Sequence, residues 1–307
     1  MKKIITAAAL VMGFAFAAQS HAAITFSFTN GSIVDSKHDL SFSSGATTKK
    51  ATFQNTDSDQ ICIYCHTPHG ASYTKGPLWN RGGTAATIGN PYSNADTMDG
   101  EVLTSFSTSS AACMTCHDGV TSMDNFINTQ LGTYNSAGVV RNFGTGGTAS
   151  IGAITAGITT ISSLMGGAAA SAADLRDDHP IGVPYCGGFS ATTAGSCVDS
   201  DFIPASTGSV AAAKLTRKTA AGVTSTPANG SIAYAATDKW WIDTDGTTTS
   251  RSKQDLTLFV RTFAAPIAGD LPSVECATCH DVHNSGNGSF LRVSNARSAL
   301  CLACHVK

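Results

Sequence analysis

Four copies of the pattern Cys-x-x-Cys-His constrain this chain more than any other feature of its sequence. Their residues are Cys62, Cys65 and His66; Cys113, Cys116 and His117; Cys276, Cys279 and His280; and Cys301, Cys304 and His305. In this pattern two thiols form thioethers to one haem c, and the adjacent histidine binds its iron. Positions i, i+3 and i+4 of a helical turn lie on one face, so each motif should form one turn. The sequence therefore predicts four covalently bound haem c groups.

Two other roles of paired cysteines fit the sequence less well. Two Cys-x-x-Cys pairs can form a Cys₄ zinc site, but zinc does not require a histidine directly after every pair. A thioredoxin-like redox site needs one pair in a βαβ context, whereas four pairs are spread along this chain. Haem attachment accounts for the cysteines and the histidine of every motif.

The number of histidines predicts how the irons are bound. The chain has nine histidines, of which His21 lies in the predicted leader and four lie in the motifs. The four that remain are the candidate distal ligands His38, His69, His179 and His283. Eight histidines complete four irons with two ligands each, which closes both axial positions. Haem enzymes generally keep one axial position open, so we predict an electron-transfer protein rather than an enzyme.

The positions of these histidines predict which iron each one serves. His69 and His283 each follow a motif histidine by three residues, too near to reach across the same porphyrin, and should bind the neighbouring haem of a stacked pair. His179 precedes Pro180, which favours an extended backbone. The predicted pairs are His69 with His117, His283 with His305, His179 with His280, and His38 with His66, the last from the same or a neighbouring subunit. Each lone histidine could instead be an ordinary surface or core residue.

The N-terminus predicts export from the cytoplasm. Lys2 and Lys3 precede an apolar run over residues 4–18, and Ser20-His21-Ala22 offers a cleavage site between small residues. This pattern is typical of a bacterial secretory signal peptide over residues 1–22 rather than of a membrane span. We therefore expect an extracellular or cell-surface location, with the periplasm as the alternative.

Two cysteines, Cys186 and Cys197, belong to no motif. In an oxidising compartment they should form a disulfide. Closing so short a loop should stabilise the fold by roughly 2–3 kcal/mol in the chain-entropy model. The alternative is two free thiols.

Charge argues against one class of partner. The 19 basic residues less Lys2 and Lys3 leave 17 against 21 acidic residues, a net charge of −4 for the mature chain. No basic stripe or nucleic-acid motif is present, so we expect no nucleic-acid partner. Residues 142–173 carry no charge but are too rich in Gly, Ser and Thr for a membrane helix. We expect them to pack on another protein chain or to form a buried pair of strands.

The motifs divide the mature chain into three segments. An N-terminal haem segment (23–125) holds two motifs, a Gly/Ala/Ser/Thr-rich middle segment (126–268) holds His179 and the predicted disulfide, and a C-terminal haem segment (269–307) holds two more. We predict a mostly irregular, haem-packed fold with few short helices and some short β-strands. Aliphatic residues are scattered, so the porphyrins should provide most of the apolar core.

Local patterns predict a few regular elements. Alternation over residues 24–28 predicts a strand, followed by a turn at Asn30-Gly31. Residues 256–260 predict a second strand. Ser294 or Asn295 could cap a helix that runs to Cys304.

Several further segments form a set with the motifs. They include Pro-Leu-Trp-Asn-Arg at 77–81 and Asp-Asp-His-Pro-Ile-Gly at 177–182, together with residues 37–40, 60–70, 113–119, 276–283 and 290–305. This set resembles the cytochromes with doubled Cys-x-x-Cys-His motifs from metal-reducing bacteria. Among them the chain is similar to the tetrahaem subunits that polymerise into extracellular cytochrome nanowires.

The resemblance implies a fold, a function and partners. It implies bis-histidine haems in alternating parallel and T-shaped contacts, a mostly irregular fold, and one continuous chain of haems through a filament. It also implies electron transfer to extracellular acceptors such as metal oxides, with copies of itself and other multihaem cytochromes as partners. The alternatives are a soluble periplasmic electron shuttle, an electron-transfer subunit of a reductase, and an enzyme with one open haem.

Overall fold

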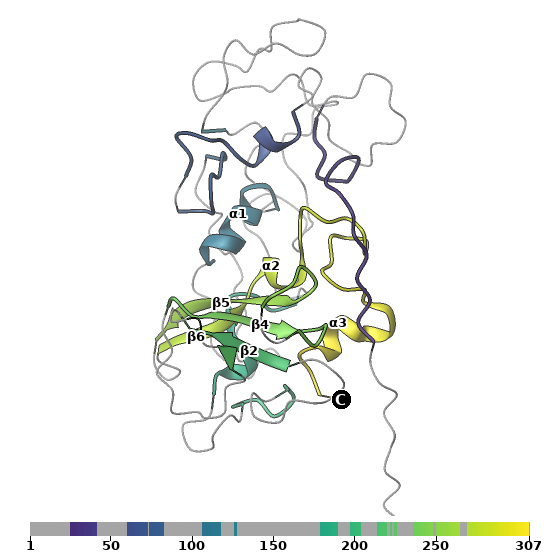
Figure 1. Cartoon of the computed structure of the whole chain (residues 1–307). Helices are drawn as coiled ribbons and strands as arrows, with labels where there is room; N and C mark the ends of the chain where they lie inside the picture. The colour runs from purple at the N-terminus through teal and green to yellow at the C-terminus, as the bar shows by residue number, and fades with distance from the viewer. Residues whose placement is uncertain are drawn as a thin grey trace, which may run out of the picture.

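The structure is a computed structural model in which the described residues form one antiparallel sheet with short helices around it (Figure 1). It describes residues 25–41, 60–72, 74–82, 106–117, 126–127, 179–189, 197–203, 214–219, 222, 224–225, 236–247, 250–264 and 269–306. The predicted signal peptide and the uncharged residues 142–173 lie outside this described part. Within it, no helix has both the length and the apolar character needed to cross a membrane.

The sheet has six strands in the described residues, in the order β1-β6-β5-β4-β2-β3, with every neighbouring pair antiparallel. The strands are β1 (Val183–Pro184), β2 (Lys214–Lys218), β3 (Thr224–Ser225), β4 (Lys239–Asp243), β5 (Leu256–Phe263) and β6 (Gly269–Val274). The strand predicted at 256–260 is confirmed as part of β5. Because β6 follows residue 268 and pairs with both β5 and β1, the middle and C-terminal segments share one sheet.

Aromatic and β-branched residues explain why the central strands form here. These side chains fit a pleated surface, and β4 and β5 are rich in them. Trp240 and Ile242 point to one face of β4 and Trp241 to the other, and all three are buried. Pro184 lies in the edge strand β1, the place in a sheet where a residue without an N–H is tolerated.

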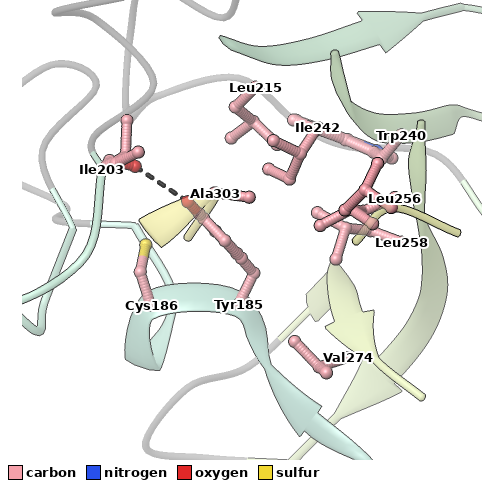
Figure 2. Close-up of a cluster of buried hydrophobic side chains, with 11 residues drawn as sticks. Tyr185, Cys186, Ile203, Leu215, Trp240, Ile242, Leu256, Leu258, Val274 and Ala303 are labelled. Atoms are coloured by element: carbon pink, nitrogen blue, oxygen red, sulfur yellow. Dashed lines mark hydrogen bonds between the residues drawn. The ribbon is translucent and has the colours of Figure 1, made fainter. Parts of the chain in front are cut away.

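One face of the sheet carries the main hydrophobic core (Figure 2). Its buried members are Tyr185, Cys186, Ile203, Leu215, Trp240, Ile242, Leu256, Leu258, Val274, Val293 and Ala303. The Tyr185 hydroxyl donates a 3.0 Å hydrogen bond to the Ile203 carbonyl. The predicted disulfide between Cys186 and Cys197 is present at the edge of this core. It ties the turn after β1 to the segment that reaches Ile203.

The described helices are few and short. They are the 3₁₀ turns η1 (Cys62–Tyr64), η2 (Tyr185–Gly187) and η3 (Ala296–Ser298), and the α-helices α1 (Thr108–His117), α2 (Cys276–Cys279) and α3 (Ala299–Leu302). The helix predicted from residue 294 or 295 to Cys304 is interrupted. Arg297 and Ser298 have φ values of 57° and 59°, in the left-handed region, so α3 begins only at Ala299.

The strand predicted at 24–28 is wrong over its described residues, because residues 25–32 form no strand. This N-terminal segment lies instead along the C-terminal loop. Ser294 donates its N–H to the Ser27 carbonyl over 2.9 Å, and Thr29 donates its N–H to Asn287 Oδ1 over 3.0 Å. A strand would need a regular ladder of backbone hydrogen bonds to a neighbouring strand, whereas this segment makes only isolated hydrogen bonds to a loop.

Two glycines allow this segment to approach the loop. A Cβ atom added at Gly286 would collide with the Thr29 carbonyl, and one added at Gly31 would collide with the backbone nitrogen of Gly286. The predicted turn at Asn30-Gly31 is also wrong, because the chain turns at residues 33–39. Gly31 is therefore a close-contact residue rather than a turn residue.

Candidate haem sites

Each of the four motifs forms a single helical turn, which confirms the local prediction. His66, His280 and His305 donate their backbone N–H to the carbonyl of the first cysteine of their own motif, over 2.8, 3.1 and 2.9 Å. The second motif lies at the end of α1, of which His117 is the last residue. The thiols and the imidazole of each motif thus start from one face of one turn.

A second segment fixes the histidine in three of the motifs. Isolated backbone bridges pair His66 with Trp79, His280 with Leu291, and His305 with Phe202. Each bridge holds the backbone of the histidine directly after the turn that carries the two cysteines. The direction in which the imidazole leaves the turn is therefore set by a neighbouring segment of the fold.

The segment 77–81 joins the first two motifs. Asn80 Nδ2 donates to the Ile63 carbonyl in η1 over 2.8 Å, and Arg81 Nη2 donates to the Thr115 carbonyl in α1 over 3.3 Å. Trp79 Nε1 donates to Thr115 Oγ1 over 3.3 Å. Asn80 and Arg81 are buried, so these polar contacts lie inside the fold. They hold η1 and α1 in a fixed relation.

Glu275, directly before the third motif, joins three elements. Its carboxylate accepts hydrogen bonds from Ser110 in α1 and Ser273 in β6, and lies 3.7 Å from Arg261 Nη1 in β5. Its N–H donates to Thr278 Oγ1 over 2.9 Å in a capping box at the start of α2. Burial raises the pKa of Glu275, while the hydrogen bond from Ser110 acts in the opposite direction. Glu275 therefore couples the second motif to the third.

Thiols of consecutive motifs lie near one another. Burial raises the pKa of Cys65 in the first motif to about 12, and the nearby Cys116 thiol of the second motif adds to this effect. A hydrogen bond from Cys113 to Cys276 raises the pKa of the donor and lowers the pKa of the acceptor. The second motif therefore lies beside both the first and the third.

The third and fourth motifs are neighbours in the same way. Burial raises the pKa of Cys279 to about 11, and Cys301 of the fourth motif contributes to the rise. Burial also raises the pKa of Cys304, with Cys279 contributing. These shifts apply to the chain before haem attachment, because thioethers do not titrate. The four motifs follow one another in space in their sequence order.

Three pairs of histidine rings lie at nearly the same separation. The ring centres are 6.0 Å apart for His38 and His117, 6.1 Å for His66 and His283, and 6.4 Å for His179 and His305. A metal–imidazole bond is about 2.0 Å long and the ligating nitrogen lies about 1.1 Å from the ring centre, so two axial imidazoles have centres about 6.2 Å apart. Each pair therefore fits one iron between a motif histidine and a candidate distal histidine.

Hydrogen bonds orient several of these rings for metal binding. The Nδ1 atom of His66 lies 3.2 Å from the Pro77 carbonyl. The Nδ1 atom of His179 lies 3.0 Å from the Pro180 carbonyl, and that of His280 lies 2.8 Å from the Ser289 carbonyl. A carbonyl only accepts, so Nδ1 carries the proton and Nε2 keeps a lone pair. Metal-bound histidines usually make this second contact, because it fixes the tautomer and the ring orientation.

The ring of His38 is held by a stacked aromatic side chain. Phe290 stacks on it with ring centres 4.3 Å apart and planes 10° from parallel. Burial, followed by the nearby His117, lowers the pKa of His38 to about 4. His38 is therefore neutral near pH 7, which is the form that binds a metal.

These ring contacts differ from the ligand pairs predicted from the sequence. His38 lies beside His117, His283 beside His66, and His179 beside His305, whereas the predicted partners were His66, His305 and His280. His69 was expected to bind the iron of His117; His69 and His280 belong to none of the three pairs. The prediction paired motifs that are neighbours in sequence, whereas the loop at 281–290 folds back toward the N-terminal segment. One part agrees with the structure, because His283 does not face the histidine of its own motif.

Two residues that connect the motifs, Glu275 and Arg81, resemble ordinary surface charges in the sequence, although both are almost completely buried. A partial signal was present for each. Arg81 ends the Pro-Leu-Trp-Asn-Arg segment, and Glu275-x-x-Thr278 has capping-box spacing with the two residue types exchanged.

The two C-terminal motifs lie in a segment that matches a known family. A family model described as the doubled CXXCH motif matches residues 266–307, which contain the third and fourth motifs. No curated protein matches the chain. The match agrees with the turn geometry of these motifs. The doubled motif indicates covalently bound haem c, and with it a haem-binding cytochrome of electron transfer.

Proposed function

We propose that this chain is a tetrahaem electron conduit in which each iron is held by two histidines. The observation that carries the proposal is the separation of 6.0–6.4 Å between the ring centres of three histidine pairs. Each haem would supply an iron that alternates between the ferric and ferrous states. The histidines would close both faces of that iron, which favours electron transfer over substrate binding.

The spatial order of the motifs supports a continuous path. Thiols of the first and second, second and third, and third and fourth motifs are near enough to perturb one another's pKa. The contacts of Arg81 and Glu275 would hold these neighbours at fixed separations. A rigid arrangement suits electron transfer because little needs to reorganise when the charge moves.

His280 and His69 remain for the fourth iron after the three pairs are formed. The Nδ1 contact of His280 with the Ser289 carbonyl leaves its Nε2 available for a metal. His69 follows the first motif and is exposed. We propose that His69 supplies the distal ligand to the iron of His280, in the same chain or in a neighbouring copy.

We further propose that the protein acts outside the cell as a filament. The N-terminal pattern of residues 1–22, the resemblance to filament subunits and the uncharged residues 142–173 support this location and assembly. The partners would be further copies of the chain, other multihaem cytochromes and extracellular acceptors such as metal oxides. A periplasmic shuttle typically uses charged patches for docking, and this chain is sparse in charge.

Spectroscopy of the mature secreted protein tests the haem arrangement. The mass of the denatured protein should equal the polypeptide plus four haems. The reduced protein should show no change in the Soret band under carbon monoxide, because no axial position is open. Carbon monoxide binding to one or more irons would contradict bis-histidine ligation, and three or fewer haems would contradict the tetrahaem proposal.

Electron microscopy of the untagged mature protein, without crosslinker, tests the assembly. Ordered filaments with haem absorbance would support the conducting polymer. Dispersed monomers under the same conditions would favour a soluble periplasmic shuttle or a reductase subunit, and would leave the electron-transfer role itself unchanged.

A further inference from the structure

Three aspartates meet at the turn between β4 and β5, outside the haem motifs. The register pairs Ile242 with Leu256, so the next residues, Asp243 and Asp255, stand opposite each other at the end of the ladder. Asp245 lies two residues further into the turn. Three carboxylate oxygens, one from each aspartate, lie within 4.8 Å of one another.

One oxygen in this cluster is buried and has no partner. Asp243 and Asp255 are both 0% exposed. Oδ1 of Asp243 accepts the N–H groups of Asp245 over 3.1 Å and of Gly246 over 2.7 Å. Its Oδ2 has no hydrogen-bond partner. A buried charged oxygen without a partner is costly, and native structures nearly always satisfy such a group.

No described Lys or Arg forms a direct ion pair with any of the three aspartates. Arg292 is near enough for its charge to act on Asp255, but its guanidinium lies 3.8 Å from Asp281 and donates to the Ala277 and Lys253 carbonyls. Like charges directly opposite each other on two strands are destabilising. In the described residues, the cluster therefore has no cation in direct contact with it.

We infer that this turn, formed by Asp243, Asp245 and Asp255, binds one calcium ion. Calcium takes carboxylate and other oxygen ligands at about 2.3–2.6 Å, so ligands on opposite sides lie about 4.6–5.2 Å apart. Magnesium demands octahedral geometry at about 2.0–2.1 Å and usually keeps several waters, which suits an all-protein cage less well. The ion would receive the unpartnered Oδ2 of Asp243 and would join the ends of β4 and β5.

Calorimetric titration of the mature, haem-loaded protein with CaCl₂, after EDTA treatment and dialysis, tests the site. Asp245→Asn is the main variant because Asp245 is exposed, so the substitution should leave the fold and the haem spectrum intact. Asp201→Asn is the matched control, since Asp201 is exposed and lies outside the cluster. Haem carboxylates also bind calcium weakly, but they are the same in all three proteins.

We expect one calcium per chain in the wild type and in Asp201→Asn, with at least tenfold weaker binding in Asp245→Asn. Calcium should also raise the thermal midpoint of the wild type but not of Asp245→Asn. Equal binding by the wild type and Asp245→Asn would overturn the site, as would the absence of binding. Equal affinity for MgCl₂ would overturn the assignment to calcium.

Discussion

The sheet region (β1–β6 with the turn Tyr185–Gly187) and the N-terminal motif region (η1, α1 and residues 77–81) differ in what fills their interiors. In the sheet region aromatic and aliphatic side chains pack together, and Trp240 and Leu256 are each 1% exposed. The hydrophobic cluster around η1 instead has Tyr64 as its buried member, with partly buried neighbours such as Phe126. Met114 of α1 is also fully buried, and buried polar residues, including Arg81, make further contacts there.

The sequence predicts that porphyrins provide most of the apolar core, but this cannot hold for the sheet region. The sheet region has a core of its own side chains, which can stabilise it by burial of apolar area. In the N-terminal motif region, the described buried apolar side chains are fewer, and haems would add apolar surface to them. We therefore expect folding to depend on the cofactor more strongly there than in the sheet region.

The largest effect should come from the third motif, which lies between the two regions. Replacing Cys276 and Cys279 by Ala should prevent accumulation of the whole protein, because α2 contacts both α1 and β5. The matched variant replaces Cys62 and Cys65, at the far end of the series, and should give a reduced yield of a trihaem protein. Immunoblots and haem staining of secreted protein measure both. A normal yield of a stable trihaem form from the Cys276/Cys279 variant would contradict this prediction.

The next largest effect should follow from separating the N-terminal segment from the C-terminal loop. In Gly286→Ala the new Cβ would collide with the Thr29 carbonyl, so the segment that carries His38 should move away. If His38 and His117 hold one iron, as proposed, that iron should then open and bind about one equivalent of carbon monoxide. Asn30→Ala, on the exposed side of the same segment, is the control and should bind none. If Gly286→Ala binds no carbon monoxide either, His38 is not held by this contact.

A buried ion pair tests the sheet region alone. Arg217 pairs with Asp238, whose side chain is 2% exposed, and lies over the Trp240 ring at 5.7 Å from its centre. Arg217→Ala should lower the free energy of unfolding of the sheet region by about 3 kcal/mol, because it leaves a buried carboxylate without its cation. Hydrogen exchange of β2 and β4 amides measures the loss, with Lys218→Ala as control. The haem spectrum should not change; a shifted spectrum would show that the two regions are less independent than we expect.

The smallest effect should come from the hydrogen bond that links the regions. Ser110→Ala removes a donor to the buried carboxylate of Glu275 and should cost about 2 kcal/mol in the stability of α1 and α2. Ser109→Ala, one residue away and bonded to Ser107 instead, is the control. Hydrogen exchange of the two helices gives the measurement. Equal protection in both variants would mean that Glu275 does not couple the second motif to the third.

The prediction succeeded where short-range spacing decides the structure. Cys62 and His66 form one turn because a helical hydrogen bond spans four residues, and the chain needs no distant contact to make it. Residues 256–260 form a strand because their side chains suit a pleated surface that is buried in part. Cys186 and Cys197 are joined across a short loop that leaves each one few other partners.

Prediction failed where contacts join distant parts of the chain. Residues 25–28 alternate as a strand should, but no strand of the described residues lies beside them, and residues 25–32 contact the loop at 285–294 through isolated hydrogen bonds. The partners of His66 and His179 come from far along the sequence, and nothing local encodes them. The sequence by itself determined the attachment turns, the number of available histidines and the disulfide, because each depends on residue type and short spacing. Only the tertiary structure decided which rings face each other and where the sheet lies, because these depend on how remote segments pack.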